Sequence, residues 1–258
     1  SHGAAAVIPP VLYYFAKKNL KTIHHNFLWL MDRVVICAAL AGSLIRIGNF
    51  TNSEIYGDPV NHPTETVFFR PVLDYFDSYF SNIIDESKFN PTGEYLASDS
   101  LSLPEYELII IPKPGVSIGT IQSVLELQME PMFNSQNKDS RHLYIPKNSY
   151  FSPIGNNLYA LSLYGIPRFP TQLFEAAGYL LIFIILFLLG ENNQLTHRGR
   201  IFGLFLILVF GFRIGIEFLK ANQKSFEANM NLNMGQILSI PLVVAGLYLL
   251  INSLRRSN

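Results

Sequence analysis

The chain has 258 residues, of which 49% are hydrophobic and only 15% are charged. Its 19 basic and 19 acidic residues balance, so no overall charge indicates a nucleic-acid partner, and none is predicted. The single cysteine, Cys37, excludes an internal disulfide, and the six histidines match no metal-binding spacing, so no metal site is predicted.

Five apolar stretches dominate the chain: 4–16, 27–45, 173–190, 201–219 and 235–252. A helix of about 20 residues spans the hydrocarbon core of a bilayer, so the last three are long enough alone. The first is short and contains Pro9 and Pro10, so it spans only with a kink that neighbouring helices shield. Runs such as YLLIFIILFLLG have no polar face at helical period, which favours lipid contact over the core of a soluble protein. We therefore predict an all-α polytopic membrane protein with about five transmembrane helices.

Basic residues in the predicted connections set the orientation of these helices. They follow the first stretch, separate the third from the fourth, and follow the fifth: Lys17, Lys18, Lys21, Arg198, Arg200, Arg255 and Arg256. With five crossings these places share one side of the membrane, and the positive-inside rule makes that side cytoplasmic. The polar segments at the other helix ends are predicted to be extracytoplasmic: His2, 46–57, 167–172, 213–218 and 233–236.

The segment between the second and third apolar stretches has a different composition. It holds thirteen Asp and Glu residues between 58 and 139 and is punctuated by prolines. LIIIP (108–112) is predicted to be a strand, and 116–132 a mixed strand or an amphipathic helix. The predicted division is therefore 1–57 with two membrane helices, 58–166 as an extracytoplasmic α+β insert, and 167–258 with three membrane helices. The insert is interpreted as a solvated domain or lid, and a role in substrate contact stays open.

Ionisable residues within the apolar segments are candidates for a functional site, because charge at membrane depth is costly. Arg46, Arg213 and Glu217 are such residues, and Arg168 and Glu175 lie near an expected interface. Arg213 and Glu217 are four residues apart, so they share one helix face. Arginine offers a planar fork of donors that suits a phosphate oxygen. A structural ion-pair network between helices is the alternative.

Neutral polar residues close to Arg46 add to this pattern. Asn49 and Asn52 supply donors and acceptors, and Gly48 is predicted to let the backbone approach another group closely. Together with the arginines, they have the chemistry that a lipid headgroup site needs.

Three other residue types are candidates for chemistry. The imidazole of His2, with a reference pKa of about 6.5, could accept a proton from a thiol or hydroxyl, or the residue is incidental. Cys37 is interpreted as a small buried hydrophobe rather than a nucleophile. Gln172 and Gln236 begin two predicted helices, and they are interpreted as helix-start residues unless the site uses them.

Several motifs resemble one enzyme family. RIGNFTNSEIYG (46–57) resembles the signature GRIGNFINGELYG of the phosphatidylglycerol–prolipoprotein diacylglyceryl transferases, and Ser1-His2-Gly3 resembles their His-Gly motif. PRFPTQLFEA, GFRIGIEF and NMGQILSIP resemble the later family segments RHPTQLYEA, YGLFRFIVEF and SMGQ followed by proline. These matches occur in family order over about 1–57 and 165–258. The chain is therefore interpreted as the carboxy-terminal two-thirds of a family member with an unusually long extracytoplasmic insert.

The resemblance implies an activity, a location and partners. The family transfers the diacylglyceryl group of phosphatidylglycerol to the lipobox cysteine thiol of a preprolipoprotein, forming a thioether, and requires no metal or organic cofactor. The expected location is the bacterial cytoplasmic (inner) membrane, as a multi-pass protein. The implied partners are phosphatidylglycerol, preprolipoprotein signal peptides and membrane lipids.

The resemblance also implies roles for particular residues. Arg46 and Arg213 would hold the phosphate and stabilise charge on the leaving group, and His2 would help to deprotonate the thiol. The implied substrate-binding set is Arg46, Asn49, Asn52, Glu54, Gln172, Arg213 and Glu217. Phe169 stands where the family motif has histidine, and Val209 where it often has tyrosine, so no role carries over to either. A non-catalytic or transport membrane protein with a polar intramembrane site is the alternative function.

Overall fold

The computed structural model describes residues 2–20, 26–97, 101–134, 142–192, 195, 197–220 and 232–255, with the backbone alone for residues 2–6. The chain forms two compact units. The helical unit comprises 1–48, 172–218 and 224–258, and the sheet unit comprises 49–171 and 219–223. The predicted division at 57/58 and 166/167 stays a prediction.

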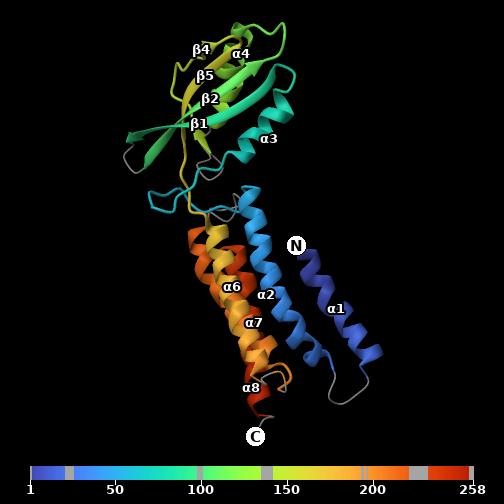
Figure 1. Ribbon diagram of the computed structural model, residues 1–258. Helices are drawn as coiled ribbons and strands as arrows, with labels where there is room; N and C mark the ends of the chain where they lie inside the picture. The colour runs from blue at the N-terminus through green and yellow to red at the C-terminus, as the bar shows by residue number, and fades with distance from the viewer. Residues whose placement is uncertain are drawn as a thin grey trace. The chain divides into compact units, whose positions relative to one another are not determined.

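The helical unit contains long apolar helices (Figure 1). They are α1 (His2–Asn19), α2 (Phe27–Thr51), α6 (Thr171–Glu191), α7 (Arg200–Ile216) and α8 (Met234–Arg255), with a 3₁₀ turn, η3 (Glu217–Leu219), following α7. Within the described residues, four segments are long and apolar enough to cross a membrane: Phe27–Thr51, Thr171–Glu191, Arg200–Leu219 and Met234–Arg255. The predicted count of about five is therefore corrected to four. The helix α1 is not among these four segments. It contains Pro9 and Pro10, and Lys17 and Lys18 lie in its last turn.

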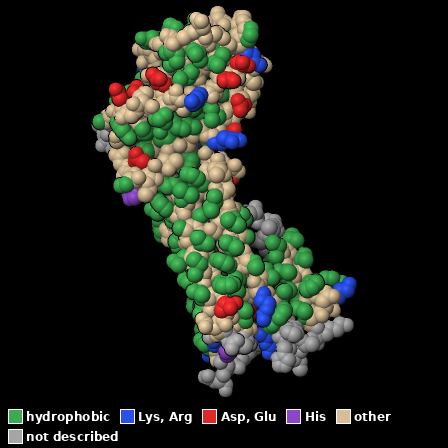
Figure 2. All heavy atoms as spheres, viewed as in Figure 1, with side chains coloured by type: hydrophobic (Ala, Val, Ile, Leu, Met, Phe, Trp, Pro, Cys, Tyr) green, Lys and Arg blue, Asp and Glu red, His purple; other side chains and the backbone are tan. Residues whose placement is uncertain are grey.

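Hydrophobic side chains cover the visible face of the helical unit, as expected for helices whose solvent is lipid (Figure 2). A smaller apolar core lies between the helices. Met31, Val35 and Ala39 of α2 pack in this core with Leu186 of α6 and Ile201 of α7. The prediction that Cys37 is buried is wrong, because its side chain is exposed on α2.

The sheet unit makes the all-α prediction wrong. Its described part contains a five-stranded antiparallel sheet of β1 (Ile84–Ala97), β2 (Ser102–Pro112), β3 (Leu143–Tyr144), β4 (Ser152–Gly155) and β5 (Leu158–Gly165). The order is β1-β2-β5-β3, and β4 pairs with β5. The predicted strand at 108–112 is the end of β2, where Leu108 and Ile110 point into the core. β1 is mostly polar and exposed, and it joins the sheet at its edge by pairing with β2 over most of its length.

Helices complete the core of the sheet unit. They are α3 (Arg70–Tyr79), α4 (Ile118–Val124), a π-helical turn, η1 (Leu125–Met129), and α5 (Glu130–Phe133). Residues 116–132, predicted as a mixed strand or an amphipathic helix, are thus helical over most of their length. Buried Val72, Phe76, Ile121 and Met129 pack against the inward face of the sheet. Acidic and basic side chains gather on the visible face of this unit (Figure 2).

Candidate functional site

Arg46 is paired with a buried carboxylate. Its Nε lies 3.1 Å from Oε2 of Glu175, which stands near the start of α6, and the two side chains are 14% and 0% exposed. Tyr179, one turn further along α6, donates its hydroxyl to Oε1 of Glu175 at 3.5 Å. A buried carboxylate needs a paired cation and hydrogen bonds to offset its desolvation, and these two neighbours supply both.

Arg213 and Glu217 lie at the carboxy-terminal end of α7, where the α-helix ends and the 3₁₀ turn begins. Their predicted pairing across one helical turn is present, with Nε and Oε2 at 4.0 Å. Gly235 of α8 lies against this carboxylate, because a Cβ atom there would collide with it. A larger residue at position 235 would therefore require the Glu217 carboxylate to move.

Tyr179 connects the two arginines. Its hydroxyl interacts electrostatically with both Arg46 and Arg213. Its ring packs edge-on against Phe212, the residue before Arg213, with ring centroids 6.0 Å apart. We call Arg46, Glu175, Tyr179, Arg213 and Glu217 the arginine cluster. Two guanidinium groups beside two carboxylates and a phenol can exchange an internal ion pair for contacts to a phosphate. The spacing of Tyr179, four residues after Glu175, was the signal that could have identified it.

Asn233 and Gln236 form a reciprocal cap at the start of α8. The backbone N–H of Gln236 donates to Oδ1 of Asn233 at 2.9 Å, and the backbone N–H of Asn233 donates to Oε1 of Gln236 at 3.2 Å. This is the capping-box arrangement, so the interpretation of Gln236 as a helix-start residue is confirmed. Gln172, at the start of α6, is fully buried.

The remaining predicted site residues are distributed over both units. Asn49, Asn52 and Glu54 belong to the sheet unit, whereas Arg46, Gln172, Arg213 and Glu217 belong to the helical unit. Asn49 is half-buried in the last turn of α2, and Asn52 and Glu54 are exposed. His2 begins α1, but its side chain lies outside the described part of the structure.

The segment 46–57, which we call the signature segment, forms a strained turn after α2. The backbone N–H of Glu54 donates to the carbonyl of Asn49 at 2.8 Å. Ser53 and Ile55 have positive φ angles of 55° and 59°. A β-branched residue such as Ile55 rarely adopts this conformation, which costs about 1–3 kcal/mol and persists only where the surrounding structure imposes it.

Gly57 lies in close backbone contact with other segments of the sheet unit. Its N–H donates to the carbonyl of Phe169 at 2.9 Å, and its carbonyl accepts from Nη1 of Arg168 at 3.2 Å. A Cβ atom at Gly57 would lie 2.6 Å from the carbonyl oxygen of Leu219, whereas nothing lies within 4 Å of the same position at Gly48. No protein group therefore approaches Gly48 closely among the described residues, and a close approach of bound lipid to Gly48 stays a prediction.

Replacing Gly57 with alanine is therefore expected to destabilise the protein by about 1–3 kcal/mol, because backbone as well as side chains would have to move. The measurement is the unfolding free energy in detergent. Gly48→Ala is the matched control and should be neutral or slightly stabilising, because Gly48 lies within α2. Equal stability of the two variants would contradict this account.

A buried polar cluster in the sheet unit surrounds Arg168, and its other members, Tyr56 and His142, were not predicted from the sequence. The guanidinium of Arg168, which is fully buried, lies 4.9 Å from the ring centroid of Tyr56. The hydroxyl of Tyr56 hydrogen-bonds Nε2 of His142 at 3.1 Å. The cluster thus connects Tyr56 of the signature segment with Arg168, which precedes α6, and His142, which precedes β3. Together with the hydrogen bond from Arg168 to Gly57, it holds the turn around Gly57 in place. Because its members are far apart in sequence, no spacing indicates it.

Burial, and secondarily the charge of Arg168, lowers the pKa of His142 to about 4. The pKa of a histidine in an unfolded chain is about 6.5, so protonation favours unfolding. The sheet unit should therefore hold its full stability above about pH 6.5 and lose up to about 3 kcal/mol as the pH falls towards 4. The measurement is the unfolding midpoint of wild type and His142→Gln across this range. A loss of the same size in both proteins would exclude His142 as its source.

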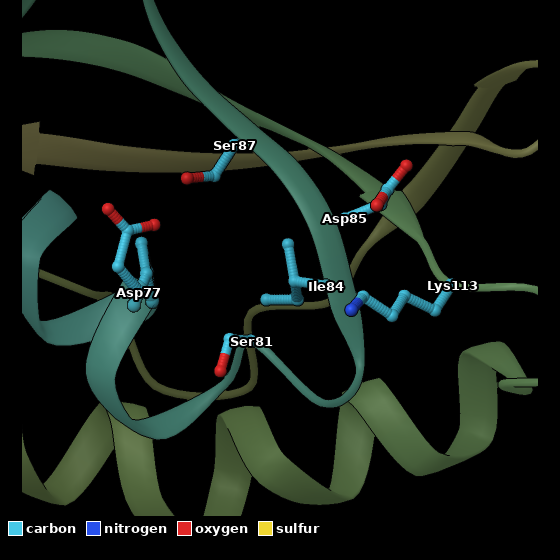
Figure 3. A pocket seen from close by; sticks show the side chains of 7 residues that line it. Asp77, Ser81, Ile84, Asp85, Ser87 and Lys113 are labelled. Carbon is cyan, nitrogen blue, oxygen red and sulfur yellow. The ribbon is translucent and has the colours of Figure 1, made fainter.

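A small cavity of about 120 Å³ lies elsewhere in the sheet unit (Figure 3). Asp77 of α3, Asp85 and Ser87 of β1, and Lys113 line it. No group of three or more potential metal-ligating side chains occurs among the described residues. The cavity contains none of the predicted site residues.

The long apolar helices are those of a multi-pass membrane protein, and paired arginines and carboxylates lie on three of them. Residues 1–252 match the model of one family, prolipoprotein diacylglyceryl transferase, so the chain belongs to this family. The match includes residues 58–166. The interpretation of the chain as the carboxy-terminal two-thirds of a member with a long insert is therefore not supported.

Curated relatives agree with this assignment. The chain is 27% identical to the phosphatidylglycerol–prolipoprotein diacylglyceryl transferase of Tolumonas auensis, over 98% of this chain and 61% of the relative. It is 24% identical to the same enzyme of Porphyromonas gingivalis, over 99% of this chain and 62% of the relative. A shorter match to that of Bacteroides fragilis has 51% identity over 32% of this chain and 30% of the relative. The chain thus spans less than two-thirds of the length of these relatives. No solved structure matches the chain.

Proposed function

We propose that the protein transfers the diacylglyceryl group of phosphatidylglycerol to the cysteine thiol of a prolipoprotein. The family match over residues 1–252 carries this proposal, and the names of the related enzymes supply both substrates. In the reaction, the thiol sulfur bonds to the glyceryl carbon while the bond from that carbon to the phosphate oxygen breaks. The thiol proton passes to a base, and glycerol phosphate leaves. No cofactor is part of this scheme.

The arginine cluster supports a specific role in this reaction. Negative charge accumulates on the phosphate as the carbon–oxygen bond breaks, and preorganised cationic donors stabilise such charge best in a site of low dielectric. Arg46 and Arg213 would supply these donors, while Glu175 and Glu217 hold their guanidinium groups in place before the lipid arrives. In this proposal Asn49, Asn52, Glu54 and Gln172 contact the headgroup, and His2 accepts the thiol proton.

The transfer reaction can be tested directly. Purified full-length protein is incubated with phosphatidylglycerol and a lipobox peptide, and mass spectrometry detects the diacylglyceryl thioether. A peptide with serine in place of the lipobox cysteine is the control and should gain no mass. Folded protein that gives no thioether would favour the alternative, a non-catalytic or transport protein.

The proposal places the protein in the bacterial cytoplasmic membrane, with the signature segment and residues 58–166 outside the cytoplasm. The support is the clustering of basic residues described above.

Orientation is testable with single cysteines in a Cys37→Ser background. Leu127→Cys in the sheet unit is expected to react with an impermeant maleimide in intact spheroplasts, because Leu127 is highly exposed. Lys18→Cys, at the end of α1, should react only after permeabilisation. The reverse pattern would invert the proposed topology.

A further inference from the structure

An apolar groove of about 540 Å³ runs between α2 and α6 in the helical unit, and no residue of the arginine cluster lines it. Leu40 and Leu44 of α2 and Phe183 and Phe187 of α6 line its length. Two charged residues, Arg33 and Glu191, also line it, and Glu191 is the last residue of α6. The groove is thus apolar along its length and carries both signs of charge near one end.

Arg33 is held in a fixed orientation. Its guanidinium lies 3.8 Å from the ring centroid of Trp29, and its Nη1 donates to the carbonyl of Trp29 at 2.9 Å. Within the described residues, neither Arg33 nor Glu191 forms an ion pair. A preorganised guanidinium with unused N–H groups and an exposed carboxylate therefore line the same groove.

The dimensions of the groove match one leaflet of a bilayer. Arg33 and Leu44 are separated by three helical turns, or ~16 Å along the axis of α2. Half of the hydrocarbon core is ~15 Å thick. Trp29 lies one turn beyond Arg33 towards the helix start, and tryptophan is enriched at the membrane interface. In a helix that spans a bilayer, these dimensions would put the charged end at headgroup level and the other end of the apolar part at about the bilayer midplane.

We propose that this groove binds a phospholipid whose headgroup carries both a phosphate and an ammonium group, as phosphatidylethanolamine does. The phosphate contacts Arg33, the ammonium contacts Glu191, and an acyl chain lies between Leu40, Leu44, Phe183 and Phe187. An anionic headgroup without an ammonium would satisfy Arg33 but would place its charge near the Glu191 carboxylate, which is unfavourable. This site goes beyond the proposed function, because phosphatidylglycerol, the proposed substrate, has no ammonium group.

Cys37 provides a native reporter, since it is exposed and lines the groove. Delipidated full-length protein in detergent is titrated with phosphatidylethanolamine or with phosphatidylglycerol of the same acyl chains. The alkylation rate of Cys37 by N-ethylmaleimide is followed by peptide mass spectrometry. Phosphatidylethanolamine is expected to protect Cys37 at a concentration at which phosphatidylglycerol does not. No turnover is involved, so failure of the transfer reaction would not affect this result.

Charge-neutral variants test the two contacts. Arg33→Gln is expected to raise the phosphatidylethanolamine concentration needed for protection about tenfold, the usual effect of losing a charge-assisted hydrogen bond. Glu191→Gln should abolish the difference between the two lipids. Arg255→Gln, at the end of α8 and outside the groove, is the matched control and should behave as wild type. Equal protection of wild type by the two lipids would overturn the proposal, and this comparison does not depend on any variant folding.

Discussion

Replacing Arg46 or Arg213 with alanine is expected to lower the rate of thioether formation by about 10²–10³-fold, the usual effect of removing one donor from a preorganised charge-stabilising site. Lysine keeps the charge but loses the planar fork, so Arg46→Lys and Arg213→Lys should retain little activity. The measurement is the initial rate of transfer from phosphatidylglycerol to a lipobox peptide, at equal amounts of folded protein.

The structure makes one control necessary for Arg46. Its removal leaves the buried carboxylate of Glu175 without this cation, which destabilises a fold independently of catalysis. Arg46→Ala combined with Glu175→Gln removes both charges and should recover thermal stability without recovering transfer. Arg255→Ala, at the far end of α8, should transfer at nearly the wild-type rate. If Arg46→Ala and Arg213→Ala transferred at wild-type rates, the arginines would not bind the phosphate, and the arginine cluster would serve only helix packing.

The membrane helices could be predicted because their signal is local. Each of the stretches 27–45, 173–190, 201–219 and 235–252 is uniformly apolar over a length that spans a bilayer, and each lies within a helix or a helix and its final turn. The stretch 4–16 gives a weaker signal for a membrane helix. It is apolar, but it contains Pro9 and Pro10 and is followed by Lys17 and Lys18, so its apolar run is short.

The sheet could not be predicted in full, because strand pairing depends on residues that are far apart in the chain. The apolar run at 108–112 revealed part of β2. β1 has the sequence IDESKFNPTGEYLA, which lacks the alternation typical of strands, and it is held by backbone hydrogen bonds to β2. The membrane helices alone therefore do not define the fold class of the whole chain.

The arginine cluster also contains one contact that is local in sequence and one that is not. Arg213 and Glu217 could be paired from their spacing, because a helix brings residues four apart onto one face. The partner of Arg46 comes from a different helix, so only the fold identifies Glu175. Equally, the two glycines of the signature segment look alike in sequence, and only the fold shows that Gly57 is the one in close contact.

Asp32 illustrates a charged residue in an apolar helix whose role is structural. It is fully buried, and its carboxylate accepts hydrogen bonds from the backbone N–H groups of Gly199 at 2.6 Å and Phe202 at 2.8 Å. Gly199 is the N-cap residue of α7, so a side chain of α2 caps another helix. The first N–H groups of a helix have no partner within it, and a negative charge also complements the helix dipole there.

Replacing Asp32 with alanine is therefore expected to destabilise the helical unit by about 2–4 kcal/mol, because two buried N–H groups lose a charged acceptor at once. Asp32→Asn keeps one acceptor oxygen and should cost less. The measurement is the unfolding free energy in a fixed detergent, with Glu191→Gln as the control, since an exposed carboxylate should change stability by no more than about 0.5 kcal/mol. Because the cap joins α2 to α7, Asp32→Ala should also increase proteolysis at the start of α7. Wild-type stability and protease resistance in Asp32→Ala would show that α7 does not depend on this cap.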